Sequence, residues 1–439
     1  MPCMPPDALP VRDILATRPG SPTWAKACFW LITMRIAVWH NLPSGGGKRA
    51  LYDHVCGLVA GGHHVEAWAP PTRNPDYLPL SDIIPEHIVP LELPTGRTLS
   101  EKLQLRSYAD RLIAGMDAHC RQCASEIEAG GFDVLFANSC MFLRTTSIGR
   151  FTRLPSVLYL QEPYRWLYEA MPDLIWAAKP KGTAPRAKFV DVRKVKDARV
   201  QVREEIANAK AFDKLLCNSY FSRESILRSY GVDAEVCYLG IDIDHFRPRD
   251  VLRGNFVVGL GAFTREKNMQ LCIDAMSLLA EPRPALRWIG NVNEQAYLTE
   301  MRDLAKARGV SLETHQNVSE EELLDTLCRA VAMIYTPRLE PFGLAPLEAG
   351  ASGTPVVAVA EGGVRETVRD GVNGLLVDGR PELIAAALQS LLDHPDLARR
   401  LGEQARALVE KNWGLAASNA RLIAKLAEAV EAHRTVAKA

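Results

Sequence analysis

The chain has 439 residues, too many for one typical domain, and 47% of them are hydrophobic, which is ample for two or three buried cores. Its 52 Lys and Arg residues balance its 52 Asp and Glu residues, so no net charge attracts nucleic acid and a charged partner has to meet a local patch. The 10 scattered cysteines indicate reduced thiols in a cytosolic protein rather than a disulfide framework. No apolar run is long enough to span a bilayer, which predicts a soluble protein or one bound at a membrane surface.

Residues 1–33 are rich in proline and lack clear periodicity, so we expect a loosely ordered N-terminal extension. The apolar residues 28–32 within it leave a weak amphipathic membrane anchor as the alternative.

The first core strand, 36–39, runs into a glycine loop that contains Gly46 and Gly47. A helix over 50–60 and a second strand at 65–68 complete a βαβ unit. The glycine spacing departs from the dinucleotide pattern, so NAD binding is disfavoured. Lys48 either adds a positive charge to this loop or lies on the solvated surface.

An amphipathic helix over 106–129 precedes two further strands, 133–137 and 156–160. Gln161 follows the second of these strands, where its amide can donate and accept hydrogen bonds but cannot act as an acid or base.

A basic segment covers residues 179–210. It is either a solvated helix face or a patch that meets anionic lipid or a phosphate-bearing acceptor. Cys120 and Cys123 form the only CxxC, with no second pair nearby, so we expect them to be structural and predict no metal site.

A strand at 331–335 ends at Pro337, and Gly343 opens a helix before the next buried strand at 356–360. Free backbone amides at the start of that helix favour an anion such as a phosphate. The residues that carry them are Phe342, Gly343 and Leu344. Glu340 and Glu348 flank this anion site, and carboxylates accept hydrogen bonds from sugar hydroxyls. The stretch therefore predicts a ligand with both phosphates and hydroxyls.

The frame Glu-Pro-Phe-Gly-Leu, with Glu340 followed eight positions later by Glu348, resembles the signature of family 4 retaining glycosyltransferases, mannosyltransferase-like members in particular. The resemblance implies the α/β GT-B architecture, in which two Rossmann-like, doubly wound parallel-sheet domains face each other across a cleft. It assigns Glu340 to the donor sugar and Glu348 to the nucleotide ribose, and places Gly46 and Gly47 beside the donor diphosphate.

The resemblance also divides the chain. It predicts an acceptor domain over 34–248, a donor domain over 249–412 and a C-terminal helix, 413–439, that crosses back to the first domain. Asp242 and Asp244 form a DxD, the metal-binding signature of the other large glycosyltransferase fold, but their position in the domain linker disfavours a metal role.

Family members carry two cations that grip the diphosphate, and Lys267 matches one of them. Ala262 occupies the position of the second, an arginine, so we expect Arg265 to reach into the site in its place. Gln161 stands where related mannosyltransferase-like sequences have a histidine beside the reacting sugar, and its amide can still hydrogen-bond a sugar hydroxyl. The resemblance makes the residues after it candidates for an acceptor groove, with packing as the alternative for the two aromatic rings: Tyr164, Arg165 and Trp166.

The function implied is transfer of a hexose, with retained configuration and no metal or other cofactor, from GDP-mannose or a UDP-sugar to the hydroxyl of a sugar, a lipid-linked or another acceptor. Such an enzyme would serve polysaccharide, glycolipid or glycoconjugate synthesis, in the cytoplasm or peripherally at the inner face of the membrane. Two alternatives remain: a catalytically silent homologue that binds a nucleotide sugar and supports a partner, and a nucleotide-sugar epimerase of the same architecture.

Overall fold

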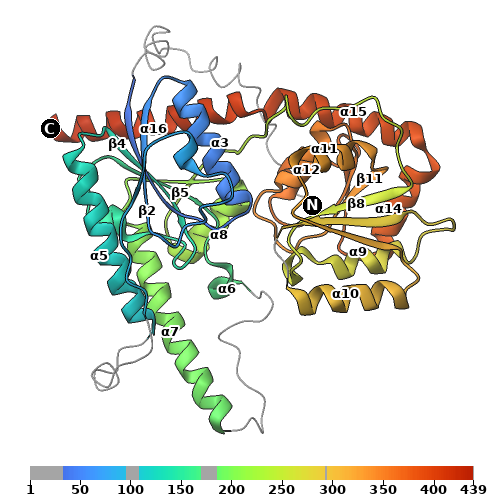
Figure 1. Ribbon diagram of the computed structural model, residues 1–439, viewed down its shortest axis with the longest axis horizontal. Helices are drawn as coiled ribbons and strands as arrows, with labels where there is room; N and C mark the ends of the chain where they lie inside the picture. Colours follow the sequence, from blue (N-terminus) through green and yellow to red (C-terminus); the bar gives the residue numbers. More distant parts are fainter. Residues whose placement is uncertain (1–32, 95–107, 170–184, 292–293, 439) are drawn as a thin grey trace.

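The computed structural model describes residues 33–94, 108–169, 185–291 and 294–438. The predicted N-terminal extension therefore lies outside the described residues except at Thr33. Two parallel sheets stand side by side, each covered by helices on both faces (Figure 1).

The first domain is built on a 7-stranded parallel sheet in the order β3-β2-β1-β4-β5-β6-β7. The central strand β4 is buried along its whole length and β1 at every residue after Arg35, as expected of apolar strands covered on both faces. Its strands are β1 (Arg35–Asn41), β2 (His64–Ala69), β3 (Glu86–Ile88), β4 (Val134–Cys140), β5 (Ser156–Gln161), β6 (Lys214–Cys217) and β7 (Glu235–Val236). Its helices are α3 (Gly46–Ala60), α5 (Tyr108–Ala129), α6 (Arg165–Tyr168), α7 (Pro185–Ala209) and α8 (Tyr220–Tyr230).

The second domain has a 6-stranded parallel sheet in the order β10-β9-β8-β11-β12-β13. Its strands are β8 (Phe256–Leu260), β9 (Ala285–Gly290), β10 (Leu312–Gln316), β11 (Ala332–Tyr335), β12 (Val356–Val359) and β13 (Gly374–Val377). Its helices are the 3-10 turn η4 (Arg265–Lys267), α9 (Met269–Met276), α10 (Gln295–Ala307), α11 (Glu320–Arg329), α12 (Leu344–Ala351), α13 (Val364–Thr367), α14 (Pro381–Asp393) and α15 (Pro395–Asn412).

In each sheet, the sequence order of neighbouring strands reverses once. The reversal lies between β1 and β4 in the first sheet and between β8 and β11 in the second. Doubly wound sheets bind ligands beyond the carboxyl ends of the strands at such a reversal point. The fold class predicted from the sequence, two doubly wound domains of the GT-B architecture, is confirmed.

The last helix, α16 (Leu415–Lys438), leaves the second domain and packs on α3, β4 and β5 of the first. Figure 1 shows α15 and α16 running along one side of both domains. Ser418 Oγ donates a hydrogen bond to the Tyr238 carbonyl at 3.0 Å, and the Ile241 amide donates to the Trp413 carbonyl at 2.8 Å. The crossing therefore occurs at Trp413, between the end of α15 and the start of α16.

Side chains of the second domain also hold the first domain directly. The Glu366 carboxylate, on α13, accepts hydrogen bonds from the amides of Tyr220 and Phe221 at 3.0 Å each, and from the Tyr238 hydroxyl at 2.9 Å. Tyr220 and Phe221 are the first residues of α8, so Glu366 supplies a negative charge where the helix dipole favours one. Phe342 and Tyr238 pack on Trp413, with ring centroids 5.5 and 5.0 Å away.

Helix α3 begins at Gly46, four residues before the predicted start. Gly45 makes this possible because its φ of 133° is rarely adopted by residues with a side chain. The amides of Lys48 and Arg49 donate to the Gly45 carbonyl, at 3.1 Å each. Gly46 and Gly47 thus lie in the first helical turn rather than in a loop.

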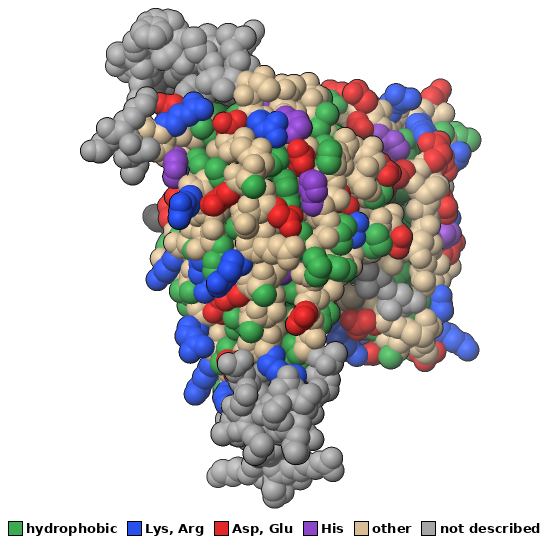
Figure 2. Space-filling view, turned by 60° about the vertical axis from the view of Figure 1, so that its left-hand side comes forward, with side chains coloured by type: hydrophobic (Ala, Val, Ile, Leu, Met, Phe, Trp, Pro, Cys, Tyr) green, Lys and Arg blue, Asp and Glu red, His purple; other side chains and the backbone are tan. Residues whose placement is uncertain are grey.

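The cations of the basic segment that can be placed lie on α7, which projects beyond the first sheet (Figure 1), except Lys210, which follows the helix. Those that are exposed are Arg193, Lys194, Lys196, Arg199, Arg203 and Lys210. Figure 2 shows basic side chains along one edge of the molecule, interspersed with neutral and hydrophobic ones. Across the described parts of the chain, no helix has both the length and the hydropathy needed to cross a bilayer.

Lys48 takes neither of the two positions expected for it. Its side chain is buried, and its Nζ has no hydrogen-bond partner. Burial lowers the pKa of Lys48 to about 8, partly offset by the nearby Glu86 carboxylate. No hydrogen bond compensates the buried amine, so keeping it charged costs free energy.

We expect Lys48→Met to raise the free energy of unfolding at pH 7 by about 2 kcal/mol, because an apolar chain of similar length removes this desolvation cost. The pKa of Lys48 is lower in the folded chain than in the unfolded one. The wild-type chain therefore gains stability as pH rises from about 8 towards 10.5, the usual pKa of lysine. The advantage of the variant should shrink over that window. Denaturant unfolding at pH 7 and pH 10 measures both values, and an advantage that grows with pH would contradict the assignment.

Candidate active site

A cleft of about 440 Å³ lies where the carboxyl ends of the two sheets face each other. The first domain lines it with Ser44, Gly45, Gly46, Gly47, Arg49, Tyr77, Gln161, Glu162, Arg165, Asn218 and Leu239. The second domain contributes Gly261, Ala262, Lys267, Asn317, Val318, Glu320, Glu340, Phe342, Gly343, Leu344 and Glu348, among others.

The amino end of α12 opens into this cleft. Gly343 precedes the helix with a φ of 98°, and no side chain caps this end of the helix. This conformation favours glycine, and a Cβ at Gly343 would also crowd the Val364 side chain, at 3.3 Å. Phe342, Gly343 and Leu344 all line the cleft, as the sequence predicts, and the dipole of α12 favours an anion beside them.

Lys267 and Glu340 form an ion pair in the cleft into which the amino end of α12 opens. The Lys267 Nζ donates to the Glu340 Oε2 at 2.7 Å, and the two side chains are 27% and 16% exposed. Both residues face the cleft, so a ligand can reach the pair.

Two glycines fix the backbone of Glu340. The Gly363 amide donates to the Glu340 carbonyl at 2.7 Å. A Cβ at Gly362 would lie 2.3 Å from the Glu340 carbonyl oxygen, and one at Gly363 would lie 2.0 Å from the Pro341 carbonyl oxygen. The two loops can approach this closely only because both positions lack a side chain.

Gln161 ends β5 in a strained turn. Its φ is 59°, uncommon for a residue with a side chain, and the Glu162 amide donates to the Leu160 carbonyl at 2.6 Å to close a γ-turn. The Gln161 amide nitrogen then lies 3.4 Å from the Gly47 carbonyl oxygen. A Cβ at Gly47 would approach the Gln161 side chain to 3.1 Å, so Gly47 leaves room for it. Strain of this kind gathers at functional sites.

Glu348 lies on α12 with 6% of its surface exposed, and burial raises the pKa of its carboxyl group. Arg49 offsets this effect. The Arg49 guanidinium comes from α3 of the first domain and forms an ion pair with Glu320 at the start of α11 in the second. It also lies 5.9 Å from the Tyr77 ring centroid. No pattern within one segment predicts the contact between Arg49 and Glu320, because these residues are 271 positions apart.

Arg265 does not reach the cleft, which corrects the expectation from the sequence. Its guanidinium donates to Glu300 at 2.6 Å, lies 5.3 Å from the Tyr297 ring centroid and is 55% exposed. Arg265 and Lys267 stand two positions apart on the 3-10 turn η4, which has three residues per turn. Their side chains therefore leave the turn in different directions, Lys267 into the cleft and Arg265 towards α10. Ala262, in place of the family arginine, lines the cleft itself.

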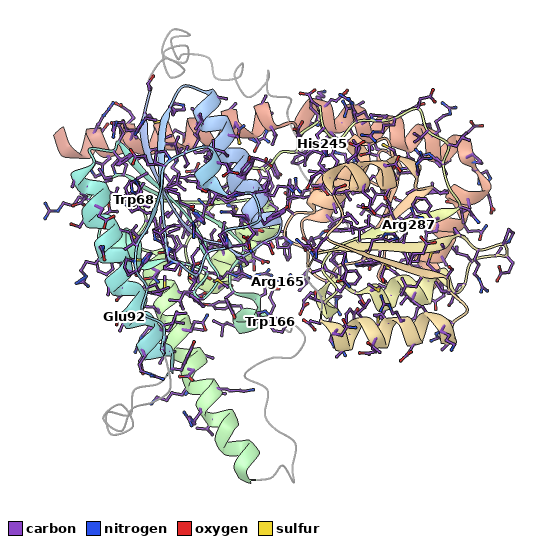
Figure 3. The ribbon with its side chains drawn as sticks, in the orientation of Figure 1. Trp68, Glu92, Arg165, Trp166, His245 and Arg287 are labelled. Carbon is purple, nitrogen blue, oxygen red and sulfur yellow. The ribbon has the colours of Figure 1, made fainter. Side chains whose placement is uncertain are left out.

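Of the three acceptor candidates, only Arg165 lines the cleft. Its guanidinium donates to the Arg338 carbonyl in the second domain at 2.6 Å and to Glu169 at 3.0 Å. Trp166 is 43% exposed, and Figure 3 shows it with Arg165 on the side of the first domain that faces the second. The Tyr164 ring instead lies 5.7 Å from the Arg144 guanidinium.

The first residue of the DxD, Asp242, hydrogen-bonds backbone amides of the linker. The Asp242 carboxylate accepts hydrogen bonds from the amides of Asp244 and His245, at 3.0 and 2.9 Å. This is the local hydrogen bonding of an Asx turn. The two cysteines of the CxxC lie on the buried face of α5, in the core of the first domain.

Two facing doubly wound domains, with a helix amino end and an ion pair between them, define a protein of the GT-B class. Residues 241–408 match the family described as glycosyl transferases group 1.

Among curated proteins, the D-inositol 3-phosphate glycosyltransferase of Streptomyces griseus is 32% identical over 260 residues, which cover 50% of this chain and 55% of that protein. The protein of the same name from Thermobispora bispora is 31% identical over 249 residues, covering 51% and 58%. The chain thus spans about half the length of the curated relatives it matches.

The fold is similar to that of solved structures at low sequence identity. The Anabaena protein HepE, in complex with UDP and glucose, superposes with a TM-score of 0.64 at 19% identity, covering 90% of this chain and 99% of that one. Sucrose-phosphate synthase from Thermosynechococcus elongatus gives 0.66 at 19% identity, covering 91% and 99%.

Proposed function

We propose that this protein is a retaining glycosyltransferase that moves a hexose from a nucleotide diphosphate sugar to an acceptor hydroxyl without the help of a metal ion. The observation that carries the proposal is the Lys267–Glu340 ion pair, 2.7 Å long and open to the cleft beside the amino end of α12. A donor needs these three groups together: amides and a cation for its diphosphate, and a carboxylate for its sugar.

The donor would enter by rearranging this pair. Its diphosphate accepts hydrogen bonds from the amides of residues 342–344 and attracts Lys267. Glu340 is then freed to accept hydrogen bonds from the sugar hydroxyls and to stabilise positive charge at the anomeric carbon. As the diphosphate leaves, its growing negative charge is held by groups that are already in place, which is the main source of catalysis in such sites.

The acceptor would approach from the first domain, past Gln161 and Gly47. For retention, its hydroxyl has to attack from the face that the diphosphate leaves, and a diphosphate oxygen takes its proton. Gln161 can orient a hydroxyl in this process but cannot exchange a proton with it.

The relatives and neighbours support a nucleotide-sugar donor. HepE was solved with UDP and with UDP-glucose, and the curated relatives are named for D-inositol 3-phosphate as substrate. UDP-glucose and GDP-mannose are therefore the first donors to test, and D-inositol 3-phosphate is one acceptor to test. A place in the cytoplasm or at the inner membrane face, and a role in polysaccharide or glycolipid synthesis, fit such a reaction.

A silent homologue that only binds nucleotide sugar is the second candidate. Two observations favour it: Ala262 faces the cleft where the family has a cation, and Arg265 is held away by Glu300.

Thermal unfolding with UDP, GDP, UDP-glucose and GDP-mannose tests donor binding, because a ligand that binds only the native state raises the melting temperature. We expect a shift with one nucleotide and its sugar, followed by slow release of labelled hexose from that donor. Binding without any release or transfer would favour the silent homologue. The absence of a shift with every nucleotide, in protein shown to be folded, would contradict both candidates.

A further inference from the structure

A carboxylate that the proposed reaction does not yet use lies on the acceptor side of the cleft. Glu162 follows the γ-turn at Gln161, lines the cleft and has a side chain that is 20% exposed. Burial raises the pKa of its carboxyl group, and the charges of Glu340 and Lys267 act on that pKa in opposite directions. The residue therefore faces the same cleft as the ion pair at which the donor sugar would react.

One oxygen of this carboxylate has no hydrogen-bond partner. Glu162 Oε2 is buried, and the nearest cation, Arg165 Nε, is 3.7 Å away, beyond hydrogen-bonding distance. The other oxygen, Oε1, lies 3.6 Å from Arg144 Nη2. A buried acceptor without a donor costs free energy. A ligand that donates a hydrogen bond to this oxygen removes that cost and binds more tightly.

The first-domain cations that line the cleft are already engaged. Arg165 donates to Glu169 and to the Arg338 carbonyl, and Arg49 is paired with Glu320. Arg144 is not among the residues that line the cleft, and its guanidinium lies near the Tyr164 ring. Within the described part of the chain, the first-domain wall thus offers a carboxylate and two paired guanidiniums, but no unengaged cation, to an incoming acceptor.

We propose, building on the transfer reaction above, that the acceptor is an uncharged sugar or polyol whose hydroxyl donates to Glu162, and that a phosphorylated acceptor is rejected. A hydroxyl satisfies the unpartnered oxygen, whereas a phosphate only accepts hydrogen bonds when ionised and repels the carboxylate. Gln161, next to it, supplies the amide that accepts or donates a second hydrogen bond to the same molecule. Glu162 is in this way a specificity-determining residue.

Matched acceptor pairs test the proposal with the wild-type protein. Suitable pairs are myo-inositol and D-inositol 3-phosphate, mannose and mannose 6-phosphate, and glucose and glucose 6-phosphate, each with the donor that gives the largest thermal shift. We expect a neutral member to be glycosylated at least about tenfold faster than its phosphorylated counterpart. Faster transfer to the phosphorylated member of any productive pair would overturn the proposal, as would the failure of every neutral compound.

The variant Glu162→Gln removes the charge and keeps the shape. Transfer to the neutral acceptor should fall about tenfold or more, mainly through KM, while the phosphorylated member gains relative to it. Release of hexose to water in the absence of acceptor is measured beside it, so that a loss of donor reaction is distinguished from a loss of acceptor binding. An unchanged ratio between neutral and phosphorylated acceptors would contradict the proposed role.

Glu66→Gln is the matched control. Glu66 on β2 also has a side chain that is 20% exposed and accepts from two cationic-type partners, the imidazoles of His64 and His87, but it does not line the cleft. We expect its acceptor preference to equal that of the wild type. If the donor neither binds nor reacts, the transfer reaction and this inference fail together; if donor release persists but the phosphorylated acceptor wins, only the acceptor assignment fails.

Discussion

Replacing Glu340 by alanine is expected to reduce transfer about 10³-fold or more while leaving the fold intact. The loss corresponds to roughly 4 kcal/mol of transition-state stabilisation, the usual magnitude when a preorganised group beside the developing charge is removed. The residue is partly exposed and its partner Lys267 can turn to solvent, so we expect stability to fall by less than about 1 kcal/mol.

Initial rates with saturating donor, together with the melting temperature, measure these two effects. Glu300→Ala is the control, since Glu300 is a carboxylate in a similar ion pair with Arg265 on the outer side of η4. Near wild-type transfer in Glu340→Ala would refute the assignment of the site.

Lys267→Met is expected to lower transfer by about 10² to 10³-fold, and to weaken binding of the free nucleotide diphosphate as well. Lys267 lines the cleft into which the amino end of α12 opens. Ala262 lines the same cleft but has no charge with which to replace it. Both binding and rate should suffer, because the charge on the diphosphate exists before the reaction and grows during it.

Arg265→Met separates the two cations of η4. Since Arg265 is held by Glu300 and does not line the cleft, its loss should change transfer less than about twofold. A loss comparable to that of Lys267→Met would show that Arg265 moves into the site when the donor binds, as the sequence comparison predicts. Titration of both variants with the nucleotide diphosphate, followed by steady-state kinetics, gives the comparison.

Much of the fold could be predicted because local patterns and long-range packing agree. Buried apolar runs such as 256–261 and 356–360 alternate with helices, and the glycine at 343 fixes where α12 begins. The helix over 319–329 follows its capping signal, with Ser319 Oγ accepting from the Glu322 amide at 3.1 Å. The donor half of the site is contained in such segments, so Glu340, Glu348 and the amides of α12 could be located from the sequence.

The rest depends on contacts between distant segments. The start of α3 moves to Gly46 because Gly45 adopts a φ of 133°, which composition alone does not reveal. The directions of Arg265 and Lys267 depend on the 3-10 turn between them. Arg49 meets Glu320, and Glu366 meets the start of α8, only because the two domains face each other. Spacing within one segment carries no information on such pairs.

The path of α16 has a consequence for how the protein is made. The first domain consists of two pieces of chain, the segment before the linker and the last helix, with the entire second domain encoded between them. A ribosome therefore releases a complete second domain while the first still lacks the helix that covers α3 and β4. We expect nascent chains that stop before Leu415 to keep an apolar surface uncovered and to bind chaperones, and premature termination there to yield aggregation rather than a smaller working enzyme.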